Sequence, residues 1–310
     1  MEEIGMPTLL GKTLLIANPA AQNGRGAVAA ERAAGLLRAA LGDDALAVEF
    51  TKQPHHAVDL AAAAGDYRTV LALGGDGVIH EVANGLMRLP AEARPQFGIV
   101  PVGSGNDYAR TLGMSTDVDK AVAQLLTAEA HPADFGTVNG HYFVETLSFG
   151  LDAAIALDTV ERRKRTGRTG TILYAEAGVD QLLHQLFARP YRASFDGGAP
   201  VAGESITFAV QVGPTYGGGF RICPDARIGD GLLDICIAHP PVTIFRAAVI
   251  FLAAKFGRHT GFKQIELLRA HKLHVEFDEA PPAQMDGEPI ESRSFDVAVE
   301  PAALRVLMPQ

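Results

Sequence analysis

Tryptophan is absent from the 310-residue sequence, and aromatic residues make up only 7% of it. Proteins that bind single-stranded nucleic acid stack bases on aromatic side chains, so this composition argues against that class. The formal net charge of −9 argues against bulk DNA or RNA binding, because neutralising phosphates requires a basic surface. The two cysteines, Cys223 and Cys236, cannot form a disulfide framework, which favours a reducing, cytoplasmic compartment.

Long hydrophobic runs and a secretory leader are also missing. The longest apolar run is Ala247–Ala254, far short of the roughly 20 residues that a membrane-spanning helix needs. The sequence opens with Met-Glu-Glu and lacks the basic start of a secretory signal. We therefore expect a soluble, cytoplasmic protein that is at most peripheral at the inner membrane face.

The first hundred residues alternate between strand-like and helical patterns. The strand-like runs are Thr13–Ala17, Ala45–Phe50, Thr69–Leu73 and Phe97–Val100, and the helical ones are Ala27–Leu41, Ala57–Ala64 and Val78–Leu89. This alternation predicts βαβ units and an α/β domain with a Rossmann-like parallel sheet. Ligands of such sheets bind beyond the carboxyl ends of the strands, which is where the glycine-rich stretches of this sequence fall.

From about residue 133 the pattern changes to short strands separated by Gly, Pro and Asp. The expected strands are Tyr142–Leu147, Ser205–Val212, Leu233–Ala238, Lys272–Phe277 and Phe295–Val299, with helical stretches at Glu161–Leu186 and Val242–Phe256. This predicts a β-rich, antiparallel sandwich as the second domain. The expected domains are therefore 1–132 and 133–310, with the last strand as a candidate to return to the first domain.

The strongest local pattern is a buried strand that runs into Gly74-Gly75-Asp76-Gly77 and then directly into a helix. Glycines allow a tight turn and bring backbone N–H groups close to a phosphate, and the helix N-terminus adds positive potential. A lone aspartate would repel phosphates unless it takes part in binding Mg²⁺. The alternative interpretation is a tight strand–helix turn in which Asp76 caps the helix.

A second glycine-flanked turn follows the next strand, at Gly103-Ser104-Gly105-Asn106-Asp107. Ser104 can donate to a phosphate oxygen, and Asn106 or Asp107 can cap the helix or orient a metal-bound water. A purely structural turn is the alternative. Because carboxyl ends of parallel strands meet at one edge of a sheet, the two turns together predict a polyphosphate site.

The combination GGDGxxxEVxNGL followed by PxGxGNDxAR resembles the catalytic domain shared by diacylglycerol kinases, sphingosine and ceramide kinases, and bacterial soluble lipid kinases. GGDG alone also occurs in NAD kinases and phosphofructokinases, so the resemblance implies a first domain of that fold type. The resemblance continues at Asn18-Pro19 with Gly24 and Gly26, Thr51 with His56-Ala57, Asp134, Pro224–Asp234, Gly257–His259 and Met285–Glu288.

The resemblance implies roles for individual residues. The residues implied in ATP binding are Asn18, Thr51, Gly74, Gly75, Gly77, Glu81, Gly103, Ser104, Gly105 and Asn106. Asp76, Asp107 and Asp134 would form the acidic network around Mg²⁺, and Asp230 with the Leu232 carbonyl would hold a second, structural Mg²⁺. Asp286 would be the general base for the lipid hydroxyl, supported by Glu288. The alternative for Asp286-Gly287 is a hairpin turn, for which Asp-Gly is a standard signal.

The sequence departs from the family pattern in two places. Val78 stands where the family usually has Thr, and valine loses the hydroxyl. The opening loop reads Ala21-Gln22-Asn23 where Ser-Gly and a basic residue are common, and Arg25 is a candidate to supply the missing charge.

The predicted function is ATP-dependent phosphorylation of a lipid hydroxyl, with diacylglycerol as the first choice of acceptor. The alternatives are an NAD kinase-like nucleotide kinase and a non-catalytic lipid-binding relative. The expected partner is a lipid substrate at a membrane surface, and a homodimer is plausible. Two features stay open: the basic cluster Arg162–Arg165 with Arg168 is either a solvated helix face or a membrane contact, and Val242–Phe256 is either core or an apolar lip for acyl chains.

Overall fold

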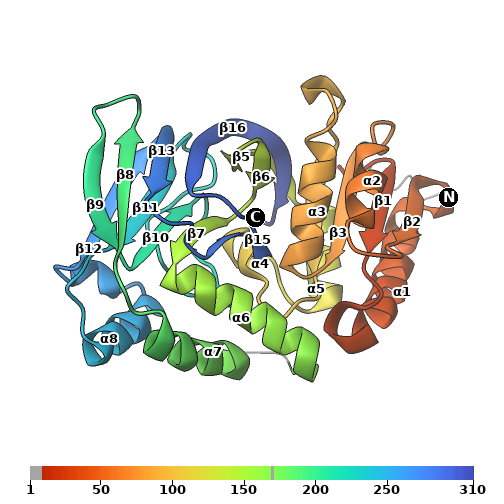
Figure 1. The fold of residues 1–310 in the computed structure, drawn as a ribbon. Coiled ribbons are helices and arrows are strands. Elements are labelled where there is room, and N and C mark those ends of the chain that lie inside the picture. Colours follow the sequence, from red (N-terminus) through yellow and green to blue (C-terminus); the bar gives the residue numbers. More distant parts are fainter. Residues whose placement is uncertain (1–8, 169–170) are drawn as a thin grey trace. The chain divides into compact units, whose positions relative to one another are not determined.

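The computed structural model describes residues 9–168 and 171–310 (Figure 1). The chain divides into two compact units. Unit 1 comprises residues 1–133 together with 302–310, and unit 2 comprises residues 134–301. The two ranges of unit 1 are joined in one sheet because the end of the last strand pairs with a strand of the first hundred residues.

Unit 1 contains a parallel sheet in the order β2-β1-β3-β4, followed by the end of β16. Its strands are β1 (Thr13–Ala17), β2 (Leu46–Phe50), β3 (Thr69–Gly74) and β4 (Gln96–Pro101), and β16 is Ser294–Met308. Every residue of β1 and β3 is buried, as expected for a parallel sheet covered on both faces. The predicted α/β architecture of this part of the chain is confirmed.

The helices of unit 1 are α1 (Ala21–Leu41), α2 (His56–Ala62), α3 (Asp76–Leu86), α4 (Asp107–Thr111) and α5 (Val118–Thr127), with short 3₁₀ turns η1 (Asp43–Ala45) and η2 (Ala91–Ala93). Helix α3 buries Ile79, Val82 and Leu86 because they recur at helical spacing. The start of α1 is irregular, since Gln22 and Asn23 have positive φ angles of 47° and 57°.

Unit 2 contains two sheets of antiparallel strands. One has the order β12-β11-β10-β7-β14-β15, and in the other β13 lies between β8 and the first part of β16, with β9 beside β8. The strands are β5 (Glu129–Val138, beginning in unit 1), β6 (His141–Phe143), β7 (Thr146–Gly150), β8 (Arg189–Phe195), β9 (Val201–Ser205), β10 (Thr207–Gln211), β11 (Leu233–Ala238), β12 (Ile265–Ala270), β13 (Lys272–Phe277), β14 (Ala283–Met285) and β15 (Glu288–Pro289).

The core of unit 2 lies between these two sheets and is rich in phenylalanine. Phe149 from β7 lies 4.5 Å from Phe295 of β16 and 5.4 Å from Phe277 of β13, measured between ring centroids. Phe208 of β10 packs on Phe149 edge to face at 6.0 Å. Side chains from both sheets therefore interdigitate, which confirms the expected sandwich.

Three longer helices gather beside the strands of unit 2: α6 (Leu151–Thr166), α7 (Thr171–His184) and α8 (Ile244–Ala254), with the 3₁₀ turn η3 at His259–Gly261 (Figure 1). The single helical stretch expected at Glu161–Leu186 is thus two helices, because α6 ends at Gly167 with a φ of 67°. Within the described residues, no helix is long and apolar enough to cross a membrane.

Candidate functional site

The two glycine-rich loops leave neighbouring strands of unit 1 at the same edge of the sheet. Gly74 at the end of β3 pairs in register with Pro101 at the end of β4. The Val102 N–H donates to the Gly74 carbonyl at 2.7 Å, which continues the ladder one residue past the strands. The structure therefore brings residues 74–77 and 103–107 together, as the strand order predicts.

The Asp76 carboxylate ties the first loop to the second. Its Oδ2 accepts from the Asn106 N–H at 2.8 Å and its Oδ1 accepts from the Asp107 N–H at 2.9 Å. These amides begin helix α4, whereas Asp76 itself is the first residue of α3 and Gly75 occupies the cap position of that helix. Asp76 thus binds the helix start of the neighbouring loop instead of capping its own helix.

Close packing explains why glycines are needed in these loops. A Cβ atom on Gly103 would lie 2.5 Å from the Gly75 Cα and 2.5 Å from Asn106 Oδ1. A Cβ on Gly105 would lie 2.6 Å from Asp76 Oδ2. Gly77 differs, since a Cβ there would meet nothing within 4 Å and the residue is exposed. Gly75, Gly103 and Gly105 therefore let the loops touch, while Gly77 leaves open space at the start of α3.

The second loop is held by its own side chains. Asn106 adopts a left-handed backbone with a φ of 53°. Its Oδ1 accepts from the Gly103 N–H at 2.8 Å, and its Nδ2 donates to the Gly103 carbonyl at 2.9 Å. Among the residues that the structure describes, the Ser104 hydroxyl has no protein hydrogen-bond partner. The loop is therefore rigid around a half-buried hydroxyl that can bind a ligand.

The other residues expected at the ATP site have local structural contacts. Asn18 Oδ1 accepts from the Ala20 N–H at 2.9 Å, and the Thr51 N–H donates to the Ala17 carbonyl at 2.9 Å. The Glu81 carboxylate accepts from the N–H groups of His55 at 3.0 Å and Ala57 at 3.3 Å, at the start of α2. Glu81 therefore faces α2 through hydrogen bonds, and its role in binding ATP stays a prediction.

Asp76 and Asp107 are the carboxylates of unit 1 that could face a metal. Both approach one point, because a Cβ on Gly105 would lie 2.6 Å from Asp76 Oδ2 and 3.2 Å from Asp107 Oδ2. Across the described part of the chain, no group of three or more His, Cys, Asp or Glu side chains could hold a metal ion. Mg²⁺ is usually held by one or two carboxylates together with substrate phosphates. The pair fits a Mg²⁺ that is shared with a nucleotide.

In unit 2, Asp286 and Gly287 form a two-residue hairpin turn between β14 and β15. Their φ angles are 48° and 92°, and Met285 pairs with Glu288. The Asp286 carboxylate points back to the start of β7, where Oδ2 accepts from Val144 N–H at 2.7 Å and Oδ1 accepts from the N–H groups of Glu145 and Thr146, each at 3.0 Å. Asp286-Gly287 thus forms a hairpin turn in which three backbone donors fix the carboxylate, and its role as general base stays a prediction. Glu288 is exposed.

The N–H groups that bind Asp286 explain why the expected strand Tyr142–Leu147 is divided in the structure. Val144 and Glu145 lie in the middle of the expected strand Tyr142–Leu147, yet β6 ends at Phe143 and β7 begins at Thr146. Their N–H groups bind the Asp286 carboxylate in place of a neighbouring strand.

The remaining metal-site candidates also lie in unit 2. The buried Asp134 carboxylate accepts from the Gly231 N–H at 2.7 Å, and the Leu232 N–H donates to Asp230 Oδ1 at 3.2 Å. Asp230 is exposed at the edge of a pocket of about 840 Å³. These contacts describe a tight turn around Asp230, and the second Mg²⁺ remains a prediction.

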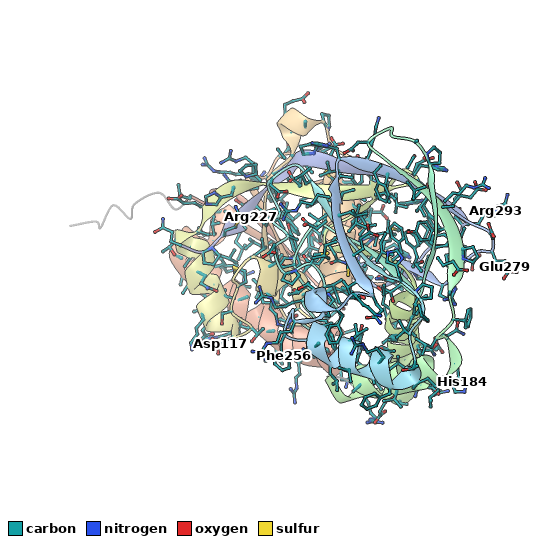
Figure 2. The ribbon with its side chains drawn as sticks, turned by 90° about the vertical axis from the view of Figure 1, so that its left-hand side faces the viewer. Asp117, His184, Arg227, Phe256, Glu279 and Arg293 are labelled. Atoms are coloured by element: carbon teal, nitrogen blue, oxygen red, sulfur yellow. The ribbon has the colours of Figure 1, made fainter. Side chains whose placement is uncertain are left out.

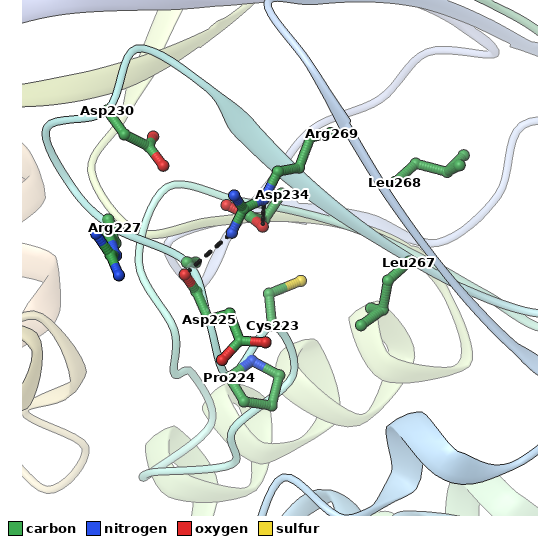
Figure 3. Close-up of a pocket in the computed structure, with 10 residues that line it drawn as sticks. Cys223, Pro224, Asp225, Arg227, Asp230, Asp234, Leu267, Leu268 and Arg269 are labelled. Carbon is green, nitrogen blue, oxygen red and sulfur yellow. Dashed lines mark hydrogen bonds and ion pairs between the residues drawn. The ribbon is translucent and has the colours of Figure 1, made fainter.

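An ion pair occupies the middle of that pocket (Figure 3). Arg269 donates to Asp234 Oδ1 at 2.8 Å and to the Asp225 carbonyl at 3.1 Å. Burial raises the pKa of Asp234, and the Arg269 guanidinium opposes that effect. Asp230 lies apart from this pair in Figure 3, so the pocket does not gather its carboxylates around one point.

Two family models cover most of the chain. Residues 12–138 match the diacylglycerol kinase catalytic domain, and residues 145–308 match the YegS C-terminal NAD kinase beta sandwich-like domain. A probable lipid kinase YegS-like of Pseudomonas aeruginosa is 35% identical over 291 residues, which cover 92% of this chain and 89% of the relative. The chain belongs to the diacylglycerol kinase and YegS-like lipid kinase family.

A further relative and two solved structures are similar over much of their length. The diacylglycerol kinase of Bacillus subtilis is 31% identical over 228 residues, or 73% of each chain. A diacylglycerol kinase structure from Bacillus anthracis has a TM-score of 0.80 at 24% identity and covers 97% of this chain and 98% of that one. An NAD kinase from Archaeoglobus fulgidus, solved with ATP, has a TM-score of 0.51 at 14% identity over 96% of this chain and 93% of its own. These two structural likenesses show the fold.

The family match confirms the resemblance seen in the sequence, and it supports an ATP-dependent kinase. Both glycine-rich loops lie inside the matched catalytic domain, and Asp230, Asp286 and Glu288 lie inside the matched C-terminal domain.

Sequence reasoning missed two residues that hold the second loop of this family's site. Gln22 Nε2 donates to the Gly103 carbonyl at 2.8 Å, and Arg110 donates to the Gly105 carbonyl at 2.6 Å. Arg110 ends the PxGxGNDxAR motif, so its place one helical turn after Asn106 was a usable signal. No sequence signal marked Gln22, because its contact with Gly103 spans 81 residues. It shows that the altered first loop still reaches the second.

Proposed function

We propose that this family member transfers the γ-phosphoryl group of ATP to the hydroxyl of diacylglycerol and forms phosphatidic acid. The observation that carries the proposal is the Asp76 carboxylate, which joins two glycine-rich loops at the carboxyl edge of a parallel sheet. Phosphoryl transfer depends mainly on positioning and on neutralising charge, and a rigid double loop would supply the positioning.

The nucleotide phosphates would lie at the start of α3, over Gly77. That glycine is exposed, has open space around it and belongs to the first turn of an 11-residue helix whose N-terminus attracts anions. The Ser104 hydroxyl would donate to a phosphate oxygen. A Mg²⁺ shared by Asp76, Asp107 and the phosphates would neutralise the charge that develops during transfer.

Asp286 would accept the proton of the lipid hydroxyl, with Glu288 in support. Three N–H donors hold the Asp286 carboxylate in one orientation. The same bonds also stabilise the hairpin, so the two roles need separate measurements. In the Asp286→Asn variant an amide NH₂ would replace one of the two oxygens that accept from the backbone N–H groups. We expect both a lower melting temperature and a loss of activity.

Diacylglycerol is the proposed acceptor because relatives from Bacillus subtilis and Staphylococcus carnosus, which are 31% and 28% identical to this chain, are named diacylglycerol kinases. The P. aeruginosa relative is named a probable lipid kinase without a stated lipid. Sphingosine, phosphatidylglycerol and undecaprenol also carry a usable hydroxyl and belong in the same assay.

The test is transfer of labelled phosphate from ATP to each lipid in the presence of Mg²⁺. We expect diacylglycerol to be the best acceptor, and Asp76→Asn to lower the rate by at least about 100-fold if it disrupts charge neutralisation and the loop junction together. Asp119→Asn is the matched control, since Asp119 lies exposed on α5 and pairs with Arg32. A folded wild-type protein that phosphorylates no lipid would refute the proposal, and a better acceptor than diacylglycerol would replace its substrate.

A further inference from the structure

Helix α8 carries two apolar stripes on opposite sides. Ala247, Phe251 and Ala254 pack against the small core that lies under α6–α8. Phe245, Val249 and Leu252 follow each other at intervals of four and three residues and therefore share the other side, and Phe256 follows just past the end of the helix. Phe245, Leu252 and Phe256 are 81%, 66% and 71% exposed. A surface helix normally turns polar residues outward, so this outer stripe calls for a partner.

The stripe lies in the longest acid-free stretch of unit 2. Between Asp234 and Glu266 the sequence has four basic residues and no acidic one, a net charge of +4 in a chain of −9. The four are Arg246, Lys255, Arg258 and Lys263. Within the described residues, no acidic side chain forms an ion pair with Arg246, Arg258 or Lys263. The exposed apolar side chains thus belong to a stretch of positive net charge, in which Arg246, Arg258 and Lys263 are exposed at the surface.

Helix α7 extends the apolar surface next to α8. The helices approach closely where a Cβ on Gly178 would lie 3.2 Å from the Phe251 ring. Beside this crossing α7 exposes Val179 and Leu183, which lie one helical turn apart and are 62% and 58% exposed. Phe256 lies at the surface past the end of α8, and His184 marks the end of α7 (Figure 2).

The basic cluster of α6 is a weaker candidate for the same role. Arg162 forms ion pairs with Asp158 and Asp180, and Arg168 pairs with Glu176 at 2.7 Å. These arginines are partly neutralised within unit 2, and no large exposed apolar side chain belongs to the described part of α6. Charge without an apolar anchor binds a membrane surface less firmly than both together.

We propose that the outer face of α8, formed by Phe245, Val249 and Leu252 and continued by Phe256, docks the protein onto a lipid bilayer with anionic headgroups. The phenyl rings would enter the boundary between headgroups and acyl chains, while Arg246, Arg258 and Lys263 would contact the headgroups. The inference deepens the proposed function and rests on it for its purpose, since a kinase that acts on a membrane lipid must meet that lipid at the membrane surface.

A second copy of this chain fits the face less well. In a symmetric dimer the same patch contacts itself, so the basic residues around one α8 would oppose those around the other. An anionic bilayer complements both the apolar stripe and its charge. Dimerisation through α8 is therefore an outcome that the experiment must be able to detect.

The experiment measures sedimentation of the purified protein with vesicles, without ATP. Wild type should bind vesicles of phosphatidylcholine with phosphatidylglycerol, more weakly at high salt, and bind pure phosphatidylcholine poorly. Phe245→Ser with Phe256→Ser should lower the partition coefficient by at least about tenfold. Arg258→Gln with Lys263→Gln should lower it about fivefold per charge.

Two controls match these variants. Arg163→Gln with Lys164→Gln and Arg165→Gln removes three charges from α6, one more than the α8 variant, and should change binding less than about twofold. Val201→Ser removes a 58% exposed side chain from β9 and should have no effect. Circular dichroism confirms that each variant is folded, which is expected because the changed residues are exposed.

Unchanged vesicle binding of the double phenylalanine variant would overturn the proposal, and so would a loss of binding in the α6 variant. A change in mass by sedimentation velocity without a change in vesicle binding would assign the face to a second copy. Wild type that binds vesicles but phosphorylates no lipid would refute the proposed function and leave the docking intact. Activity on dispersed short-chain diacylglycerol without vesicle binding would refute the docking and leave the proposed function intact.

Discussion

At the scale of single residues, Asp152 shows how burial changes a carboxyl group. It lies in the first turn of α6, where the Tyr216 hydroxyl donates to its Oδ2 at 2.5 Å. Burial raises the pKa of Asp152 to about 6, and hydrogen bonds from Tyr216 and Ser148 limit that rise. Ser148 also accepts from Gln284 Nε2, whose Oε1 accepts from the Gly287 N–H at 2.7 Å. A buried polar chain therefore connects Asp152 to the Asp286–Gly287 hairpin.

The raised pKa predicts a stability that falls with rising pH. The folded protein holds a proton on Asp152 that the unfolded chain releases near its usual pKa of 3.8, so the stabilisation is complete below that pH and is lost as the pH rises through about 6. Asp152→Asn keeps an acceptor for Tyr216 and removes the charge. At pH 8 we expect it to raise the free energy of unfolding by up to about 3 kcal/mol, and by little near pH 4. Thermal unfolding at both pH values measures this, with the exposed Asp296→Asn as control; equal destabilisation at both would contradict it.

Two glycines of the nucleotide loops predict opposite outcomes. Gly103→Ala would force a Cβ within 2.5 Å of Gly75 and of Asn106 Oδ1, so we expect a marked drop in melting temperature. Gly77→Ala meets no atom within 4 Å and lies in a helix, where alanine is favoured over glycine by up to about 1 kcal/mol. If phosphate binds over Gly77, the alanine methyl group should weaken one charged hydrogen bond and so raise the KM for ATP by about tenfold. The stability of the protein should not fall. An unchanged KM would place the phosphates elsewhere.

At the scale of elements, Glu81 of α3 caps helix α2. Its carboxylate accepts N–H bonds from His55 and Ala57 and places negative charge at the start of a helix of only seven residues. Glu81→Ala should therefore lower the free energy of unfolding by about 1 kcal/mol and leave the KM for ATP nearly unchanged. Glu31→Ala, an exposed site on α1, is the control. A raised KM at unchanged stability would instead support the direct role in ATP binding that the family resemblance implies.

Elements were predictable from the sequence where the signal is local. The expected strands Leu233–Ala238 and Lys272–Phe277 agree with β11 and β13, because their apolar residues are bounded by turn residues. Strands β8 and β9 have several exposed residues and carry no comparable pattern. Within the candidate site, the loops were recognisable from glycine spacing. The bonds between them were not, since the contact of Asp76 with Asn106 spans 30 residues and that of Asp286 with Val144 spans 142.

At the scale of the whole molecule, β16 belongs to both units. Its first residues pair with β13 in unit 2, and its last residues lie beside β4 in unit 1, where Val306 pairs with Phe97. Ala302, the first residue of β16 that belongs to unit 1, has a positive φ of 52°. The end of the chain thus adds a strand beside β4, the strand that leads into the second glycine-rich loop.

Substitution of Leu307 tests whether the end of β16 stabilises unit 1. It is fully buried, and its Cδ1 lies 2.9 Å from the point where Gly98 of β4 would carry a Cβ. Leu307→Ala should therefore lower the free energy of unfolding by about 2–5 kcal/mol through lost contacts and a cavity in unit 1. Since the chain has no tryptophan, circular dichroism is the suitable probe of unfolding. The same substitution at Leu267, which is 43% exposed, should cost far less.

If ATP binds unit 1 as proposed, saturating ATP should recover part of the stability lost at Leu307, because a ligand that binds the folded state shifts the equilibrium towards it. A Leu307→Ala protein as stable as wild type would show that β16 does not support the nucleotide loops.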